Sequence, residues 1–174
     1  MEHAAHMVDI LNEEGKVVGQ KHRREINKND DIYHVIFVLL ITPKGELVLS
    51  VIPPREDLPN LYARQMGTTV ATIRRSDETA LEAGRRCVER ELFIDKADLH
   101  FLGEQTIDLT GSSRKFMSAY YLVGEPPATF SVIDIDTLVV VTPQQLRGLL
   151  ISHADEVAPT LKVFWESYHT QLPI

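Results

Sequence analysis

The sequence contains very little cysteine, and this scarcity limits the kinds of site that the chain can build. Cys87 is the only cysteine among its 174 residues. A single cysteine excludes an internal disulfide and any zinc cluster held by several cysteines. Proteins without disulfides are typical of the reducing cytoplasm, so we expect a cytoplasmic location.

Long hydrophobic runs and an excess of basic charge are also lacking. The longest strongly apolar run, residues 35–41, is far shorter than the ~20 residues that a membrane-spanning helix needs. No basic flank followed by an apolar segment marks a secretory signal. The formal net charge of -7 gives no overall attraction to nucleic acid or to an anionic membrane. We therefore expect no nucleic-acid partner and no membrane, although a local basic pocket can still hold a phosphate compound.

The rest of the composition is that of a folded domain. Hydrophobic residues make up 44% and charged residues 25% of the chain, which is ordinary for a globular protein. A chain of this length can bury a sizeable core. Because no repeat, low-complexity tract or long linker divides it, we predict one domain over residues 7–174. Residues 1–6 are predicted to form a flexible tail.

Apolar periodicity and turn residues predict strands interleaved with a few helices. Strands are expected at residues 7–11, 17–20, 32–42, 47–52, 65–73, 99–107, 116–123 and 136–141. Helices are expected from a cap at Ser76 to about Leu92, over residues 143–150, and from Pro159 onward. This pattern predicts an α/β (α+β) fold in which a mixed β-sheet packs between helices.

Two helices carry patterns that bear on packing and on the site. In the last helix an apolar stripe is assigned to the core, with a homodimer interface as the alternative; it consists of Leu161, Phe164, Trp165 and Tyr168. At 100° per residue, the core face of the central helix carries Leu81, Val88 and Leu92. The charged residues on the opposite side of this helix are interpreted as a solvated face; they are Glu78, Glu82, Arg85 and Glu89. On that face Glu82 is spaced to pair with Arg85 or Arg86.

The central helix also resembles the signature helix of the Nudix family. That signature reads G-x5-E-x7-R-E-U-x-E-E-x-G-U, where U is a bulky aliphatic residue. Five positions match it in register, namely Glu78, Arg86, Val88, Glu91 and Ile94. Four positions depart from it: Thr72 and Phe93 replace glycines, and Cys87 and Arg90 replace glutamates.

The resemblance extends over most of the chain. Residues 9–19, 43–47, 58–62 and 141–146 are similar to segments of the Nudix branch that includes isopentenyl-diphosphate isomerase. Several such motifs in the right order imply the Nudix fold. Isomerase activity is not expected, because Ala71 and Ile73 stand where the isomerase has its catalytic cysteine and a metal-binding histidine, although His34 matches another ligand histidine.

The resemblance implies a pyrophosphohydrolase that uses Mg²⁺ or Mn²⁺ to cleave a nucleoside diphosphate linked to another group. In that family, glutamates of the helix hold the metal against the diphosphate. Here Cys87, Arg90 and Glu91 together carry a charge of about zero instead of -3. A guanidinium about 5 Å from Mg²⁺ would cost roughly 7 kcal/mol at an effective dielectric constant of about 20.

These substitutions predict a degraded metal site with weak or absent hydrolysis. The alternative is a non-catalytic module that binds a nucleotide, a diphosphate or a protein partner and needs no metal. We expect Arg90 to pair with Glu91 or with another acid, and so to take the structural place of the cation.

The candidate site residues follow from the same comparison. Glu91 and Arg86 are the candidate catalytic residues, and the candidate metal ligands are Glu91, Asp134 and Asp136. The two aspartates come just before a strand at which many family members carry functional glutamates. Arg64, Arg74 and Arg75 precede the central helix and are candidates to bind a phosphate. Exposed backbone N–H groups at the helix N-terminus would assist them.

Overall fold

The structure is a computed structural model that describes residues 6–54, 63–109 and 114–174. Residues 1–5 of the predicted tail and the isomerase-like segment 58–62 lie outside the described residues. The last residue of that tail, His6, accepts a hydrogen bond at its carbonyl oxygen from the N–H of Arg23, at 2.9 Å.

The described residues form a hairpin, a larger sheet and three α-helices. The hairpin consists of β1 (Met7–Leu11) and β2 (Val17–His22). The larger sheet contains β3 (His34–Ile41), β4 (Leu47–Val51), β5 (Met66–Gly67), β6 (Val70–Ile73), β7 (His100–Ile107), β8 (Lys115–Val123) and β9 (Thr137–Val141). The helices are α1 (Ala80–Leu92), α2 (Pro143–Ser152) and α3 (Pro159–Tyr168).

The larger sheet is mixed, as the sequence predicts. Its strands follow the order β5-β4-β3-β8-β7, with β6 also paired to β3 and β9 to β4. Strand β3 runs parallel to β8 and antiparallel to β4 and β6. No helix in the described ranges is long and apolar enough to cross a membrane.

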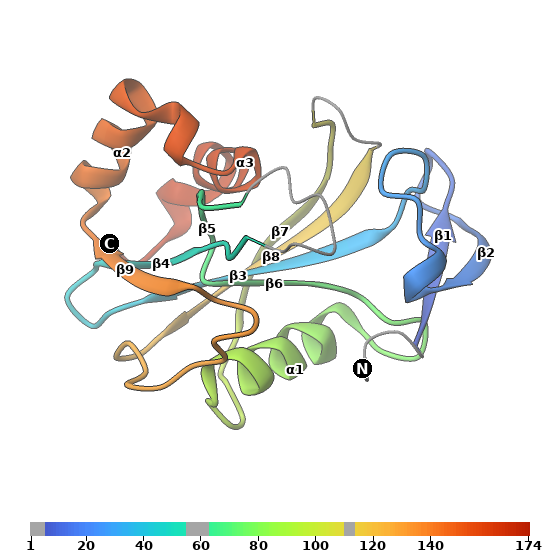
Figure 1. Ribbon diagram of the computed structural model, residues 1–174, viewed down its shortest axis with the longest axis horizontal. Coiled ribbons are helices and arrows are strands. Elements are labelled where there is room, and N and C mark those ends of the chain that lie inside the picture. Colours follow the sequence, from blue (N-terminus) through green and yellow to red (C-terminus); the bar gives the residue numbers. More distant parts are fainter. Residues whose placement is uncertain (1–5, 55–62, 110–113) are drawn as a thin grey trace.

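Alternate residues of β3 supply the two layers of the core. Ile36, Val38 and Leu40 pack with the buried face of α1, while the residues between them pack with α3. Figure 1 shows the result, with α1 on one face of the sheet and α2 and α3 on the other. The α/β (α+β) prediction is therefore confirmed. All four residues of the predicted α3 stripe are buried in this core, so the stripe offers no dimer surface.

The start of α1 differs from the prediction. The N-cap is Thr79, whose hydroxyl accepts a hydrogen bond from the N–H of Glu82 at 3.2 Å. The Glu82 carboxylate in turn accepts the N–H of Thr79 at 2.7 Å. The cap predicted at Ser76 is wrong, since the N–H of Ser76 donates to Met7 of β1. The predicted pairing of Glu82 with an arginine is also wrong, because its carboxylate completes this capping box.

One predicted strand is divided in two. Residues 65–73 form β5 and β6 with a break at Thr68 and Thr69. The buried hydroxyl of Thr69 accepts the N–H of Leu40 at 2.7 Å and donates to the carbonyl of Val48. This side chain therefore takes a place in the sheet that a backbone ladder would otherwise fill.

Candidate functional site

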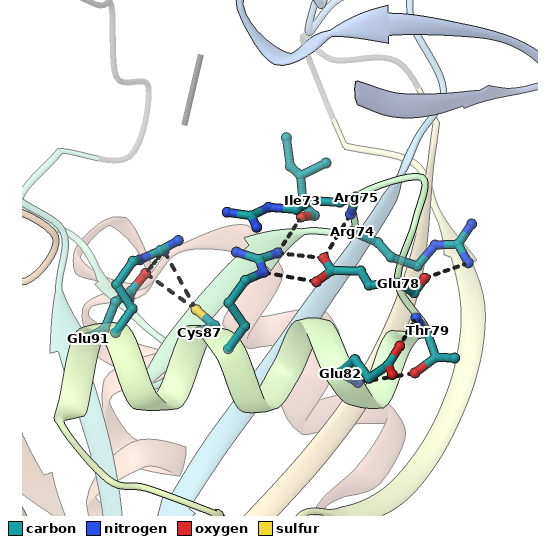
Figure 2. A network of polar contacts seen from close by, with 10 residues as sticks. Ile73, Arg74, Arg75, Glu78, Thr79, Glu82, Cys87 and Glu91 are labelled. Carbon is teal, nitrogen blue, oxygen red and sulfur yellow. Dashed lines mark hydrogen bonds and ion pairs between the residues drawn. The ribbon is translucent and has the colours of Figure 1, made fainter. Parts of the chain in front are cut away.

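The candidate site lies along α1, between the β6–α1 connection and the loop that precedes β9. Figure 2 shows Glu78, Cys87 and Glu91 on the same side of α1, with Arg75 on that side as well. The polar contacts of the site form two clusters. One is centred on Glu78 and the other on Glu91.

Arg86 holds the β6–α1 connection against the helix. Its Nε and Nη2 atoms donate to the two carboxylate oxygens of Glu78, at 2.9 and 2.6 Å. Nη2 also donates to the carbonyl oxygen of Ile73 at 3.2 Å. The N–H of Arg75 donates to the same carboxylate at 2.8 Å. Arg86 thus has a scaffold role, and interpreting Glu78 as part of a solvated face is wrong.

These contacts set the protonation state of Glu78. Burial opposes ionisation of its carboxylate, but the hydrogen bonds from Arg86 and from the Arg75 N–H hold its pKa below the ordinary value. Glu78 is therefore an ionised anchor at neutral pH.

Arg90, Glu91 and Cys87 contact one another at the positions where the family signature has three glutamates. Arg90 Nη2 donates to Glu91 Oε1 and lies 3.9 Å from Cys87 Sγ. The Cys87 thiol donates to the same Glu91 oxygen at 3.3 Å. Glu91 is only 5% exposed. The surviving carboxylate of the signature is thus already ion-paired inside the protein.

Burial controls the acid–base behaviour of this cluster. It raises the pKa of Glu91, and Arg90 opposes that rise. Burial also raises the pKa of Cys87 well above its ordinary value, and the neighbouring Glu91 carboxylate adds to the effect. A thiol that stays protonated is a poor nucleophile and a poor metal ligand.

Of the two candidate aspartates, the structure brings one close to Glu91. The hydroxyl of Ser131 donates to Asp134 at 2.7 Å, and the N–H of Ser131 donates to the carbonyl oxygen of Glu91 at 2.8 Å. Asp134 is near enough to contribute to the raised pKa of Glu91. Asp136 is exposed, and its N–H donates to Val51 of β4.

The donor set does not fit a divalent cation held in the family's manner. Mg²⁺ takes oxygen ligands in octahedral geometry, whereas the helix positions here offer a protonated thiol, a guanidinium and one ion-paired carboxylate. Across residues 6–54, 63–109 and 114–174, no group of three or more His, Cys, Asp or Glu side chains is arranged to hold a metal ion. The metal role of Glu91, Asp134 and Asp136 remains a prediction.

The three candidate phosphate-binding arginines have different surroundings. Arg74 is ion-paired with Asp9 of β1 at 3.1 Å, which ties the hairpin to the β6–α1 connection. Arg64 is exposed and has a left-handed backbone with φ of 67°. Arg75 is partly buried, and in the described part of the chain no carboxylate lies within ion-pair distance of its guanidinium.

Three backbone N–H groups that precede α1 are bonded within the protein. Those of Arg75 and Thr79 donate to the carboxylates of Glu78 and Glu82, and that of Ser76 donates to β1. Arg75, Ser76 and Thr79 therefore have no backbone N–H group left for an anion.

A further polar chain crosses three strands of the sheet. His34 Nε2 lies 2.7 Å from the hydroxyl of Ser118, which donates to Glu104 at 2.8 Å. Ser118 is fully buried, and burial lowers the pKa of His34. These hydrogen-bonded side chains thus form a structural link between β3, β8 and β7. These three residues meet because the pairing of β3, β8 and β7 brings them together. From the sequence, only the position of His34 at the start of a strand could have indicated this link.

Comparisons with known proteins place the fold. No protein-family model and no curated protein sequence matches this chain. The crystal structure of DR0079 from Deinococcus radiodurans, which is described elsewhere as a hypothetical Nudix protein, is similar with a TM-score of 0.75 and 23% identity. That match covers 93% of this chain and 99% of DR0079.

Two other solved structures are similar at lower identity. The MutT protein from Methanosarcina mazei has a TM-score of 0.63 and 16% identity, over 84% of this chain and 98% of its own. A Nudix hydrolase from Nitrosomonas europaea has a TM-score of 0.55 and 14% identity, over 80% and 89%. Such identities bear on architecture alone, and on this architecture the three agree. The chain has the Nudix fold.

Proposed function

We propose that this chain binds a small nucleotide or diphosphate compound beside α1 and has little or no metal-dependent hydrolytic activity toward it. The contact between Arg90 and Glu91 carries the proposal. It neutralises the surviving carboxylate of the signature with a fixed positive charge, which repels a divalent cation. On this proposal, binding requires neither Mg²⁺ nor Mn²⁺.

A second candidate function is hydrolysis through a rebuilt metal site, and the position of Asp134 favours it. Asp134 lies near enough to Glu91 to affect its pKa. If Arg90 turned away from Glu91, two carboxylates would then face the same region. Release of the guanidinium would have to accompany metal binding.

The experiment that separates the two functions is a panel of nucleoside diphosphate compounds, measured for both binding and turnover. Thermal unfolding is followed with each compound in EDTA, in Mg²⁺ and in Mn²⁺, and product formation is measured in the same solutions. The variants are Glu91→Gln, which removes the surviving carboxylate charge, and Glu89→Gln, which changes an exposed residue of the same helix.

Our proposal predicts that at least one compound raises the melting temperature in EDTA and that none is turned over. Turnover that needs metal and is lost in Glu91→Gln but kept in Glu89→Gln would establish the hydrolase instead. If no compound binds and none is turned over, both candidates are excluded, and a protein partner becomes the occupant to seek.

A further inference from the structure

We infer that the outer edge of β2 pairs with the same edge of a second copy of this chain, in an antiparallel arrangement centred on Gly19. This surface uses no residue of the candidate site, so the inference does not depend on the proposed function. It rests on three features of β2. Its outer edge is unpaired, the glycine at its centre is open to a neighbour, and its two ends carry opposite charges.

The hairpin presents β2 outward. Its other strand, β1, faces the rest of the molecule, because Val8 and Leu11 are buried and Asp9 is ion-paired with Arg74 at 3.1 Å. Among the described residues, β2 pairs with β1 alone. Figure 1 shows β2 at the outer margin of the molecule. The backbone N–H and C=O groups on its outer side are therefore open to another strand.

The middle of β2 lacks the residues that protect a strand edge from pairing. Natural edges are often blunted by charged side chains or by proline, and residues 17–20 contain neither. Val17 and Val18 are 55% and 64% exposed, although β-branched side chains favour sheets in which neighbours cover them. A two-stranded hairpin is marginal by itself, whereas three or more strands support one another. Two paired hairpins would form one four-stranded sheet.

Gly19 has the small size that close pairing at the centre of this edge requires. Its φ is not in the left-handed region, so the backbone conformation does not demand glycine. The register with β1 shifts between Ile10 and Leu11, but only a bulge with left-handed backbone needs glycine. A Cβ at this position would meet no atom within 4 Å. Glycine inside a strand also marks the close approach of another backbone, which a second copy would supply.

The two ends of β2 carry opposite charges at equal distances from this glycine. Glu14 lies in the turn five residues before Gly19, and Arg24 lies five residues after it. Antiparallel pairing centred on Gly19 brings Glu14 of each copy beside Arg24 of the other. Both side chains are exposed, and Arg24 makes no ion pair within the described ranges. The edge is thus self-complementary, as a two-fold symmetric dimer requires.

Three neighbouring charged residues are engaged within the chain. Lys21 is bonded to Asp31 at 2.8 Å, and the carboxylate of Glu25 accepts the N–H of His22 at 3.3 Å. Glu14 contacts Lys16 at 3.1 Å, but both side chains are largely exposed. Such surface pairs contribute little to stability, so Glu14 is available to a second copy.

Sedimentation velocity of the full chain, over a range of about 5–500 µM, tests the pairing. We expect the wild type to show a reversible equilibrium between monomer and dimer. Gly19→Asp places two carboxylates opposite each other at the centre of the interface and should weaken dimerisation at least about tenfold. The matched control is Gly148→Asp, at an exposed glycine of α2 where a Cβ would also meet no atom. It should stay within about twofold of the wild type.

A charge exchange tests the register without changing Gly19. Arg24→Glu should weaken dimerisation about fivefold, because each dimer contains the Glu14–Arg24 contact twice. Adding Glu14→Arg to the same chain restores opposite charges and should return the dissociation constant to within about twofold of the wild type. Lys44→Glu makes the same change in net charge in the exposed turn between β3 and β4 and should have no such effect.

Three results would each overturn the inference. The first is a wild type that remains monomeric throughout the concentration range, which would leave this edge to a strand of a different protein. The second is a folded Gly19→Asp variant that dimerises as tightly as the wild type. The third is failure of Glu14→Arg to restore the dimer in Arg24→Glu. If Gly19→Asp does not fold, as judged by circular dichroism, the charge exchange decides the matter.

Discussion

At the scale of single residues, two arginines one turn apart on α1 bind different carboxylates and have different roles. Arg86 binds Glu78, a residue of the preceding loop, and so fixes the path of the chain into the helix. Arg90 binds Glu91, its neighbour, at the position where the family holds metal. The first pair holds the β6–α1 connection against the helix, and on our proposal the second governs which ligands the site accepts.

The scaffold pair can be tested by Glu78→Gln. We expect this substitution to lower the free energy of unfolding by about 2–3 kcal/mol, because it leaves the partly buried guanidinium of Arg86 without its carboxylate. Urea denaturation measures the change. Glu89→Gln, at an exposed position of α1, should change it by less than about 0.5 kcal/mol. Equal effects of the two substitutions would show that the pair contributes nothing.

The same pair has a definite pH dependence. Since the folded-state pKa of Glu78 lies below its ordinary value of 4.5, its stabilising contribution is present above that value. It is lost as the pH falls through the folded-state pKa. The stability difference between wild type and Glu78→Gln should therefore shrink in acid, and a constant difference would contradict the account.

Lys115 provides a test at alkaline pH. It is 5% exposed, and its ammonium group donates to the carbonyls of Lys28 and Asp31 and lies over the ring of Tyr33. Burial lowers its pKa from 10.5 to about 8. Between these two values the unfolded chain holds a proton that the folded chain has released, so folding stability rises with pH.

We expect the wild type to gain up to about 3 kcal/mol relative to Lys115→Met between pH 8 and pH 10.5. Chemical denaturation across this range measures the gain. Lys162→Met, at an exposed lysine of α3, should show no such difference from the wild type. A wild type that loses stability relative to Lys115→Met in this window would refute the assignment.

At the scale of elements, the start of α1 shows where sequence patterns stop being sufficient. Ser76 and Thr79 are both good N-cap residues, and Glu82 stands three residues after the second. The choice depends on a contact with β1, because the N–H of Ser76 donates to Met7. Helix boundaries set by such tertiary contacts cannot be obtained from local preferences.

The corrected cap predicts different outcomes for two similar substitutions. Thr79→Ala should lower the free energy of unfolding by about 1 kcal/mol, because it removes the hydroxyl that accepts the N–H of Glu82. Ser76→Ala should change it by less than about 0.5 kcal/mol, since the contact of Ser76 with β1 uses its backbone. Thermal and urea unfolding measure both. If Ser76→Ala lowered the free energy of unfolding more than Thr79→Ala does, Ser76 and not Thr79 would be the N-cap.

The site itself was less predictable than the elements that build it. A rotation of 100° per residue predicts that Glu78 lies on a solvated face of α1, but Glu78 precedes the N-cap, so that rotation does not apply to it. Cys87 and Glu91 are buried, as a wheel could not show, and a neighbouring loop contacts this part of the helix through Ser131. Contacts between distant segments decided each of these outcomes.

At the scale of the whole molecule, the sequence predicted the architecture well. Alternating and β-branched apolar residues identified the strands, and ordered motifs implied the Nudix fold that the solved structures share. Fold and activity are separable, because the fold depends on many apolar positions and the chemistry on a few polar ones. Here α1 keeps a buried apolar face, while Cys87 and Arg90 stand at signature positions that resemble glutamate positions of the family.

Calorimetric titration of the protein with Mg²⁺ and Mn²⁺ tests most directly whether Arg90 takes the structural place of a metal ion beside Glu91. We predict no tight binding of either ion that depends on Glu91, so wild type and Glu91→Gln should give the same titration. Tight binding in the wild type that disappears in Glu91→Gln would contradict the account and show that the carboxylate still holds a metal.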